Sequence, residues 1–206
     1  MYVPPKFAVD DEEAWKIVDD AGAGMLVVQT PQGMASVYVP ILVRDDRLTL
    51  ATHVARANPW WRSVGEGTEV LALFLAASAY VTPSYYPSRF ENPEVVPTWN
   101  YVAAEIHGRA TIHDDLDWKL RQTGLVTERF ERGRDPEWCA DNLDERFREG
   151  QLKAIVGIEI EVVSIEGKAK LSQNRLEVDR VNVREELSEG SLSDRNLAQR
   201  MDPPSQ

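Results

Sequence analysis

Residues 25–53 decide the fold of this chain, and they read MLVVQTPQGMASVYVPILVRDDRLTLATH. The stretch contains three apolar runs, Met25–Thr30, Met34–Val43 and Leu48–His53. A Pro-Gln-Gly turn joins the first two runs, and a polar Arg-Asp-Asp-Arg connection joins the last two. Parallel neighbours would need crossovers of a dozen or more residues, so connections this short predict an antiparallel meander.

Later segments also have the composition of strands. They are Thr68–Leu75, Ala79–Thr82, Trp99–His113 and Ala154–Ile165. The third is long enough to be bent or bulged at Gly108. Many short antiparallel strands predict a mainly β protein, a small barrel with helices added, and not a doubly wound α/β sheet.

Helices flank and interrupt this β pattern. We expect them over Asp10–Ala21, in parts of 55–64 and 116–150, and over Ser172–Glu189 and Ser191–Met201. Charges of both signs interleave between about residues 114 and 153, which indicates a helical insertion. The chain then divides into a barrel domain, residues 1–171, and a C-terminal helical extension, residues 172–206.

The composition narrows the class of protein. The 206 residues include 34 acidic and 23 basic side chains, and the formal net charge of -11 argues against a surface dominated by polyanion binding. A single cysteine, Cys139, excludes an internal disulfide and fits a reducing cytosol. Neither a signal peptide nor the roughly 20 apolar residues of a membrane helix is recognised, so we expect a cytoplasmic protein of bacterial type.

Motifs of several enzyme classes are missing. Gly22 and Gly24 begin like a dinucleotide fingerprint, but Val27 takes the third glycine's place and the glycines precede a strand. No phosphate-binding Walker loop and no nucleophile elbow occurs. His107 and His113 lie too far apart on one strand to chelate an ion, so we expect no metal site and assign no catalytic residue.

Four segments closely resemble one protein family. They are Thr52–Arg62, Ala79–Tyr86, Val96–Ala103 and Ile165–Arg175. The third reads VPTWNYVA and the fourth reads IEGKAKLSQNR, and both are specific. Together with the opening Met-Tyr-Val-Pro-Pro, they make the chain similar to the PaiB family of FMN-binding negative transcriptional regulators, from residue 1 to about residue 190.

The resemblance implies a fold, a cofactor and a partner. The fold would be an FMN-binding split β-barrel of the flavin-reductase and pyridoxamine-phosphate-oxidase type, over residues 1–171. The partner would be a second copy of the chain, with FMN at the interface of the homodimer. The regulatory role of the family concerns protease production and sporulation.

The residues offer a phosphate site of their own. A strand end that runs into a helix N-terminus presents backbone donors and a positive dipole end to the phosphate of FMN. Thr52, His53, Arg56 and Asn58 stand at such a junction, where Arg56 could grip two phosphate oxygens. Alternatively, His53 and Asn58 only cap the short helix.

The resemblance assigns further contacts to the flavin ring. Residues on the strand under the ring would be Ser36, Val37, Tyr38 and Pro40. Many relatives carry Ser/Thr-His where this chain has Val37-Tyr38, so a role that needs imidazole is in doubt, and Tyr38 could stack, hydrogen-bond or only pack.

Trp99 and Asn100 would reach the ring from the opposite subunit. Lys170 and Gln173, also assigned to the cofactor, belong to a polar run where a strand passes into a helix. The amide of Asn100 could serve the ring's carbonyl and N–H edge, because it both donates and accepts. Lys170 could complement the negative ring edge or the phosphate, and Ser172 beside it could be a helix N-cap.

Three functions follow from these features. The first is an FMN-binding homodimeric flavoprotein with a negative regulatory role that is indirect or redox-sensing. The second is an FMN-dependent oxidoreductase acting on a small substrate, since flavin chemistry belongs mainly to the cofactor. The third is a direct DNA-binding repressor, but acidic residues interrupt every basic cluster, so we expect no direct DNA binding without a partner.

Overall fold

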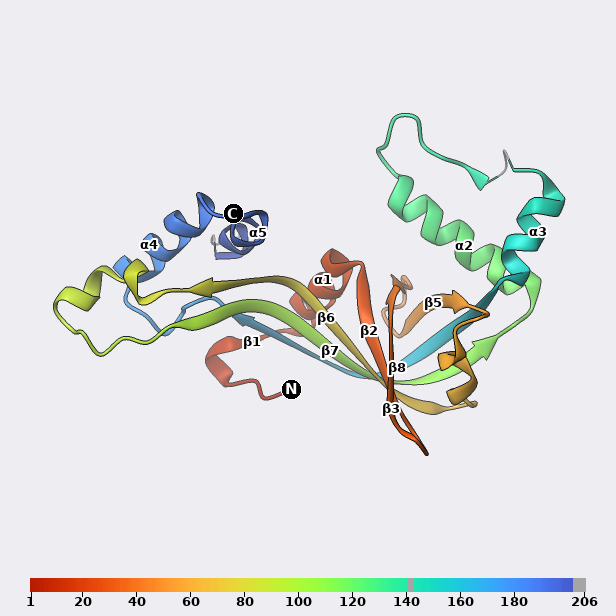
Figure 1. Cartoon of the computed structure of the whole chain (residues 1–206), viewed down its shortest axis with the longest axis horizontal. Coiled ribbons are helices and arrows are strands. Elements are labelled where there is room, and N and C mark those ends of the chain that lie inside the picture. The colour runs from red at the N-terminus through yellow and green to blue at the C-terminus, as the bar shows by residue number, and fades with distance from the viewer. Residues whose placement is uncertain (141–142, 202–206) are drawn as a thin grey trace. The chain divides into compact units, whose positions relative to one another are not determined.

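The computed structural model describes residues 1–140 and 143–201, and Figure 1 labels its elements. The helices are α1 (Asp11–Ala21), α2 (Leu116–Glu131), α3 (Glu145–Lys153), α4 (Glu177–Ser188) and α5 (Leu192–Met201). Short 3-10 helices are η1 (Pro5–Phe7), η2 (Pro59–Ser63), η3 (Pro83–Tyr85) and η4 (Pro87–Phe90). The strands are β1 (Ala8–Val9), β2 (Ala23–Thr30), β3 (Gly33–Pro40), β4 (Leu42–Val43), β5 (Thr49–Ala55), β6 (Thr68–Val81), β7 (Thr98–His113) and β8 (Ile155–Lys170).

The strands form one antiparallel sheet in the order β3-β2-β6-β7-β8-β5-β4, with β1 added on β8. β2 and β3 pair along their whole lengths, from Ala23 opposite Pro40 to Thr30 opposite Gly33. The antiparallel sheet with added helices is therefore confirmed. The antiparallel pairing of the three runs is confirmed as well. The second run is interrupted near Ile41, so that its first part, β3, pairs with β2 and its second part, β4, pairs with β5, which also pairs with β8.

The chain forms two compact units, which are described separately. The barrel unit contains residues 22–73 and 106–164. The terminal unit contains residues 1–21, 74–105 and the described residues from 165 onward. The strands β6, β7 and β8 each contribute one part to each unit.

The barrel unit closes through the stretch from β3 to β4. This stretch pairs with β2 at its start and with β5 at its end, so it joins the two ends of the strand order. Burial alternates along β2, as expected for a strand with one face in the core. Fully buried side chains of this core include Leu26, Val28, Leu50, Val156, Ile158 and Ile160.

The expected helical insertion consists of α2 and α3, between β7 and β8. Asp115 caps α2 by accepting a hydrogen bond from the backbone N–H of Trp118 (2.7 Å), and Asp144 caps α3 in the same way. Gly157 of β8 lets the Trp118 indole lie against the strand, because a Cβ there would stand 2.2 Å from Trp118 Cζ3.

The terminal unit holds the two ends of the chain. α1 buries the stripe Ala14, Trp15, Ile17 and Val18, as its sequence predicts. α4 and α5 pack against each other. No helix within residues 1–140 and 143–201 is both long and apolar enough to cross a membrane.

Two boundaries in the terminal part differ from expectation. β6 is one strand over Thr68–Val81, although small residues at its middle read as a break, because it lies between two paired strands. α4 begins at Glu177 and not at Ser172. The reason is a tight turn: Ser172 has a φ of 64°, and the N–H of Arg175 donates to the Ser172 carbonyl at 2.9 Å.

Candidate functional site

The strand β3 presents one side to solvent. Ser36, Tyr38 and Pro40 are exposed, and 66% of the Tyr38 surface is accessible, whereas Val37 is half-buried. This alternation follows from the period of two residues along a strand. β3 also packs against β5 and η2, the two elements that carry the expected phosphate junction.

Thr52 and His53 lie on β5 next to this strand. The buried Thr52 hydroxyl donates to the Pro40 carbonyl at 2.5 Å, which ties β5 to the end of β3. The Nδ1 atom of His53 is buried without a hydrogen-bond partner in the part of the chain that the structure describes. Burial lowers the pKa of His53, so its imidazole is neutral near pH 7.

Asn58 caps η2, which is one of the two roles that its sequence position left open. Its Oδ1 accepts a hydrogen bond from the backbone N–H of Trp60 at 3.0 Å, and Pro59 follows as the first residue of the turn. The expected short helix is a 3-10 turn of five residues, so its dipole is weak.

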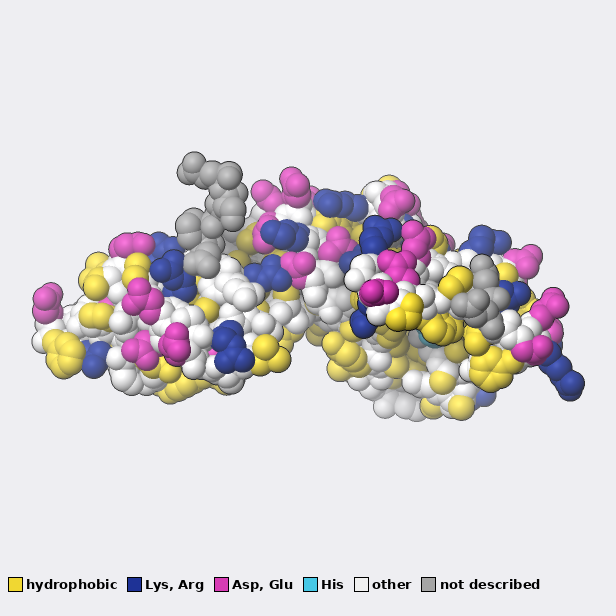
Figure 2. All heavy atoms as spheres, turned by 90° about the horizontal axis from the view of Figure 1, so that it is seen from above, with side chains coloured by type: hydrophobic (Ala, Val, Ile, Leu, Met, Phe, Trp, Pro, Cys, Tyr) yellow, Lys and Arg dark blue, Asp and Glu magenta, His cyan; other side chains and the backbone are white. Residues whose placement is uncertain are grey.

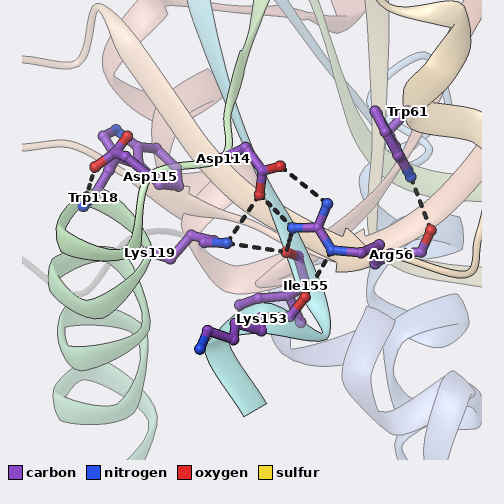
Figure 3. A network of polar contacts seen from close by, with 8 residues as sticks. All are labelled: Arg56, Trp61, Asp114, Asp115, Trp118, Lys119, Lys153 and Ile155. Atoms are coloured by element: carbon purple, nitrogen blue, oxygen red, sulfur yellow. Dashed lines mark hydrogen bonds and ion pairs between the residues drawn. The ribbon is translucent and has the colours of Figure 1, made fainter. Parts of the chain in front are cut away.

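Arg56 follows β5, and protein acceptors surround its guanidinium group (Figure 3). Nε donates to the Lys153 carbonyl (2.7 Å), Nη1 to Asp114 Oδ2 (3.0 Å), and Nη2 to Asp114 Oδ1 and to the Ile155 carbonyl (3.1 Å). These bonds use four of its five N–H groups. Arg56 therefore ties β5 to both ends of the helical insertion.

Lys119 adds a second cation to the same carboxylate. Only 2% of this side chain is exposed, and its ammonium donates to Asp114 Oδ1 (3.0 Å) and to the Ile155 carbonyl (3.5 Å). The hydrogen bond from Arg56, with a smaller contribution from Lys119, lowers the pKa of Asp114 from 3.8 to about 2. Asp114 is therefore fully ionised at neutral pH and balances two positive charges.

Asp114 and Lys119 were not recognised from the sequence. Asp114 is 58 positions from Arg56, and no spacing pattern links them. They meet because β8 pairs with β5 on one side and β7 on the other, which brings the end of β5 near the end of β7. The one local sign of a functional role was that Asp114 is a polar residue directly after a strand.

In the terminal unit, Trp99 and Asn100 point to opposite sides of β7. Trp99 is 56% exposed and meets the Tyr80 ring edge-on, with ring centroids 6.1 Å apart. Asn100 is fully buried; its Nδ2 donates to the Ser172 hydroxyl at 2.9 Å, and its Oδ1 has no partner among the described residues. Trp99 is thus the one of these two side chains that offers a surface to a ligand or a second chain.

Lys170 and Gln173 stabilise the chain around this surface. The Lys170 ammonium donates to the Thr98 hydroxyl and to the Trp99 carbonyl. Burial, reinforced by the positive charges of neighbouring basic side chains, lowers the pKa of Lys170. Gln173 closes the turn after β8, accepting from the Leu171 N–H (2.7 Å) and donating to a nearby carbonyl.

The predicted contacts therefore fall into two sets. One set lies in the barrel unit and is brought together by the Thr52–Pro40 bond and by the packing of β3 on β5 and η2. The other lies in the terminal unit and is held together by Lys170 and Ser172. Within residues 1–140 and 143–201, no cluster of three or more His, Cys, Asp or Glu side chains could hold a metal ion.

The sequence of this chain is similar to that of known proteins. Residues 1–164 match the family described as "Putative FMN-binding domain". The chain is 36% identical over 191 residues to "Protease synthase and sporulation protein PAI 2" of Bacillus subtilis, covering 91% of this chain and 89% of that one.

Solved structures share the fold. A FAD- and heme-binding protein from Mycobacterium smegmatis has a TM-score of 0.62 at 17% identity, covering 85% of this chain and 78% of that one. The flavocytochrome Anf3 from Azotobacter vinelandii also has a TM-score of 0.62, at 11% identity, covering 85% and 75%. The split β-barrel fold expected from the sequence is thereby confirmed. With its FMN-binding domain and its close Bacillus relative, the chain belongs to the PaiB family of FMN-binding proteins.

Proposed function

We propose that this protein is a homodimeric flavoprotein with a negative regulatory role, exerted indirectly or by sensing redox state. The observation that carries the proposal is the exposed side of β3 beside the β5–η2 junction, in a chain that has an FMN-binding domain. The regulatory part rests on the relative in Bacillus subtilis, whose name refers to protease synthesis and sporulation.

The barrel unit fits FMN. The buried Nδ1 of the neutral His53 has no partner among the described residues, so it can accept a hydrogen bond from the ribityl chain or a ring edge. The exposed phenol of Tyr38 offers an aromatic surface for a flat ring. Bound FMN would supply hydride and electron transfer, and the chain supplies binding and orientation.

The contacts to FMN are assigned in two groups. Residues along the ring are Ser36, Val37, Tyr38 and Pro40, and residues near the phosphate and ribityl chain are Thr52, His53, Arg56 and Asn58. A second copy of the chain adds Trp99 as the exposed contact and Asn100, Lys170 and Gln173 behind it.

The proposed homodimer has a suitable surface in the barrel unit. A groove of about 280 Å3 on the outer side of the sheet is lined by Val27, Met34, Leu71 and Val163, among others. Met34 is 67% exposed and Val163 is 64% exposed. Contact of such apolar side chains with water is unfavourable, and a second protein chain would remove it. Met34 shares the exposed side of β3 with Tyr38, so a dimer interface and the flavin contacts would be continuous.

Surface charge supports an indirect mode of regulation. On the face drawn in Figure 2, Lys and Arg side chains are scattered among Asp and Glu side chains and form no continuous patch. A protein that binds DNA directly neutralises phosphates with clustered basic residues. The net charge of -11 opposes such binding.

The absorption spectrum of the purified protein tests the cofactor and its use. We expect a flavin spectrum, release of FMN on heating, and little bleaching when NADH or NADPH is added without oxygen. A colourless protein that takes up no FMN would contradict the proposal. Bleaching at a catalytic rate would favour the FMN-dependent oxidoreductase in its place.

Co-expression of two variants tests whether the site is shared between chains. Tyr38→Asp should damage the side given by the barrel unit, and Trp99→Asp the side given by the terminal unit. Each variant alone should lose FMN. Random pairing makes half the dimers mixed, each with one intact site, so about a quarter of the FMN should return. No recovery in mixed dimers would contradict a shared site.

A further inference from the structure

Two cations in the barrel unit converge on one carboxylate. Arg56 approaches Asp114 with two nitrogens, and Lys119 approaches it with its ammonium (Figure 3). The exposures differ strongly: 2% of the Lys119 side chain is accessible, compared with 53% of Asp114. The Lys119 ammonium is therefore a buried cation paired with an exposed carboxylate, and the Arg56 side chain is itself 37% exposed.

The cations have supports that do not depend on Asp114. The guanidinium group of Arg56 also donates to the carbonyls of Lys153 and Ile155, and Lys119 donates to the Ile155 carbonyl. Asp114, in contrast, lies in the short link between β7 and α2. The neighbouring Asp115 is engaged elsewhere, as the cap of α2. If the Asp114 side chain moved, these carbonyl contacts would still hold both cations, and the donors that Asp114 now occupies would be free to bind another anion.

An Arg fork combined with an ammonium binds carboxylates and phosphate monoesters alike, because both present paired anionic oxygens. A phosphate monoester carries between one and two negative charges at pH 7, against one for a carboxylate. We infer that Arg56 and Lys119 form an anion site in which the Asp114 carboxylate is the resident anion, and that the phosphate of FMN exchanges with it. This inference rests on the proposed FMN binding.

The exchange has a measurable consequence. Asp114 competes with the phosphate, so it weakens the binding of FMN but not that of riboflavin, which lacks the phosphate. Removal of Asp114 also leaves a buried Lys119 without its counter-ion, a situation that destabilises a folded protein strongly. The protein without Asp114 would then gain stability from any phosphate that occupies the site.

Flavin titration of Asp114→Asn is the direct experiment. We expect the Kd of FMN to fall about tenfold and the Kd of riboflavin to stay the same. Asp117→Asn, an exposed carboxylate one turn away in α2, is the matched control and should change neither constant. An unchanged or increased Kd of FMN in Asp114→Asn would overturn the inference.

Lys119→Met provides a second variant in case Asp114→Asn folds poorly. It keeps the Arg56–Asp114 pair and removes one cation, so the Kd of FMN should rise and that of riboflavin should not. Equal changes for both flavins would overturn the inference.

Inorganic phosphate separates this inference from the proposed function. Phosphate should raise the Tm of Asp114→Asn more than that of the wild-type protein at equal ionic strength, whether or not flavin binds. The anion site alone would be overturned if the wild-type protein binds FMN and the variants respond to phosphate and to both flavins in the same way as the wild type. A wild-type protein that binds neither flavin would overturn the proposed function, and the phosphate response would still decide the anion site.

Discussion

Asp114 is the residue on which the barrel unit concentrates its charge interactions. It receives both nitrogens of the Arg56 fork and the buried Lys119 ammonium, and it stands where the insertion leaves β7. The same contact therefore stabilises the joint of the insertion and controls the cations that we assign to the phosphate. Stability and ligand binding at this residue should be linked.

The pH dependence of unfolding should report the ion pair of Asp114. Its pKa is about 2 in the folded state and 3.8 ordinarily, so the pairing stabilises the fold above about pH 4. This stabilisation is lost as the pH falls through about 2, because the carboxyl is then protonated in both states. In urea unfolding, the difference in stability between the wild type and Asp114→Asn should shrink over that window. A difference that stays constant down to pH 2 would contradict the assignment.

A methyl group at position 157 should displace Trp118. A Cβ on Gly157 would stand 2.2 Å from Trp118 Cζ3 and 2.9 Å from the His113 carbonyl oxygen. We expect Gly157→Ala to lower the free energy of unfolding by about 1–3 kcal/mol, measured by urea denaturation. Gly150→Ala is the control: it has open space in α3 and should stabilise the protein by about 1 kcal/mol. Equal effects at both positions would show that Trp118 does not pack on β8.

Among the elements, α4 determines the conformation of the loop between β6 and β7. The buried Asp179 of α4 accepts hydrogen bonds from the Ser88 backbone N–H (3.0 Å) and hydroxyl (2.7 Å). Asn182 donates to the Tyr85 carbonyl at 2.9 Å. This loop leads directly into Trp99, so α4 positions the surface that we assign to the second copy of the chain.

Asp179→Ala should release this loop. Two hydrogen bonds to a buried carboxylate are lost and the Ser88 N–H is left without its acceptor, so the free energy of unfolding should fall by about 2–3 kcal/mol. Hydrogen exchange at the Ser88 amide should speed up more than exchange in α1. Ser88→Ala removes only the hydroxyl bond and should cost about 1 kcal/mol. Unchanged exchange at residue 88 would mean that α4 does not hold the loop.

Local elements were largely predictable, and non-local contacts were not. The β2–β3 hairpin, α1 and the insertion followed from turn residues and periodicity. The pairing of β5 with β8 joins segments about a hundred positions apart, and no local pattern encodes it. The partner of Arg56 depends on that pairing, so Asp114 was missed.

On the scale of the whole molecule, the cofactor was predicted from the likeness to a family and not from the periodicity of the sequence. The alternation of strands and turns indicated a small barrel, but the cofactor followed from the four family-like segments and the family match over residues 1–164. The division at residue 171 stays a prediction. In the structure, α4 and α5 belong to one compact unit with residues 74–105.

The isolated protein should not bind random duplex DNA at physiological salt. The net charge of -11 per chain repels phosphates, and a dimer doubles it. Fluorescence anisotropy with labelled duplexes should give a Kd weaker than about 10 µM, with or without FMN. Submicromolar, sequence-selective binding by the FMN-loaded protein alone would establish a direct repressor.

Titration of the flavin-free protein with FMN, with the mass followed by light scattering, tests the central claim most directly. The account predicts one FMN bound per chain, in a particle of about twice the 23.3 kDa chain mass. A protein that binds no FMN, or a monomer that binds FMN at full stoichiometry, would contradict it.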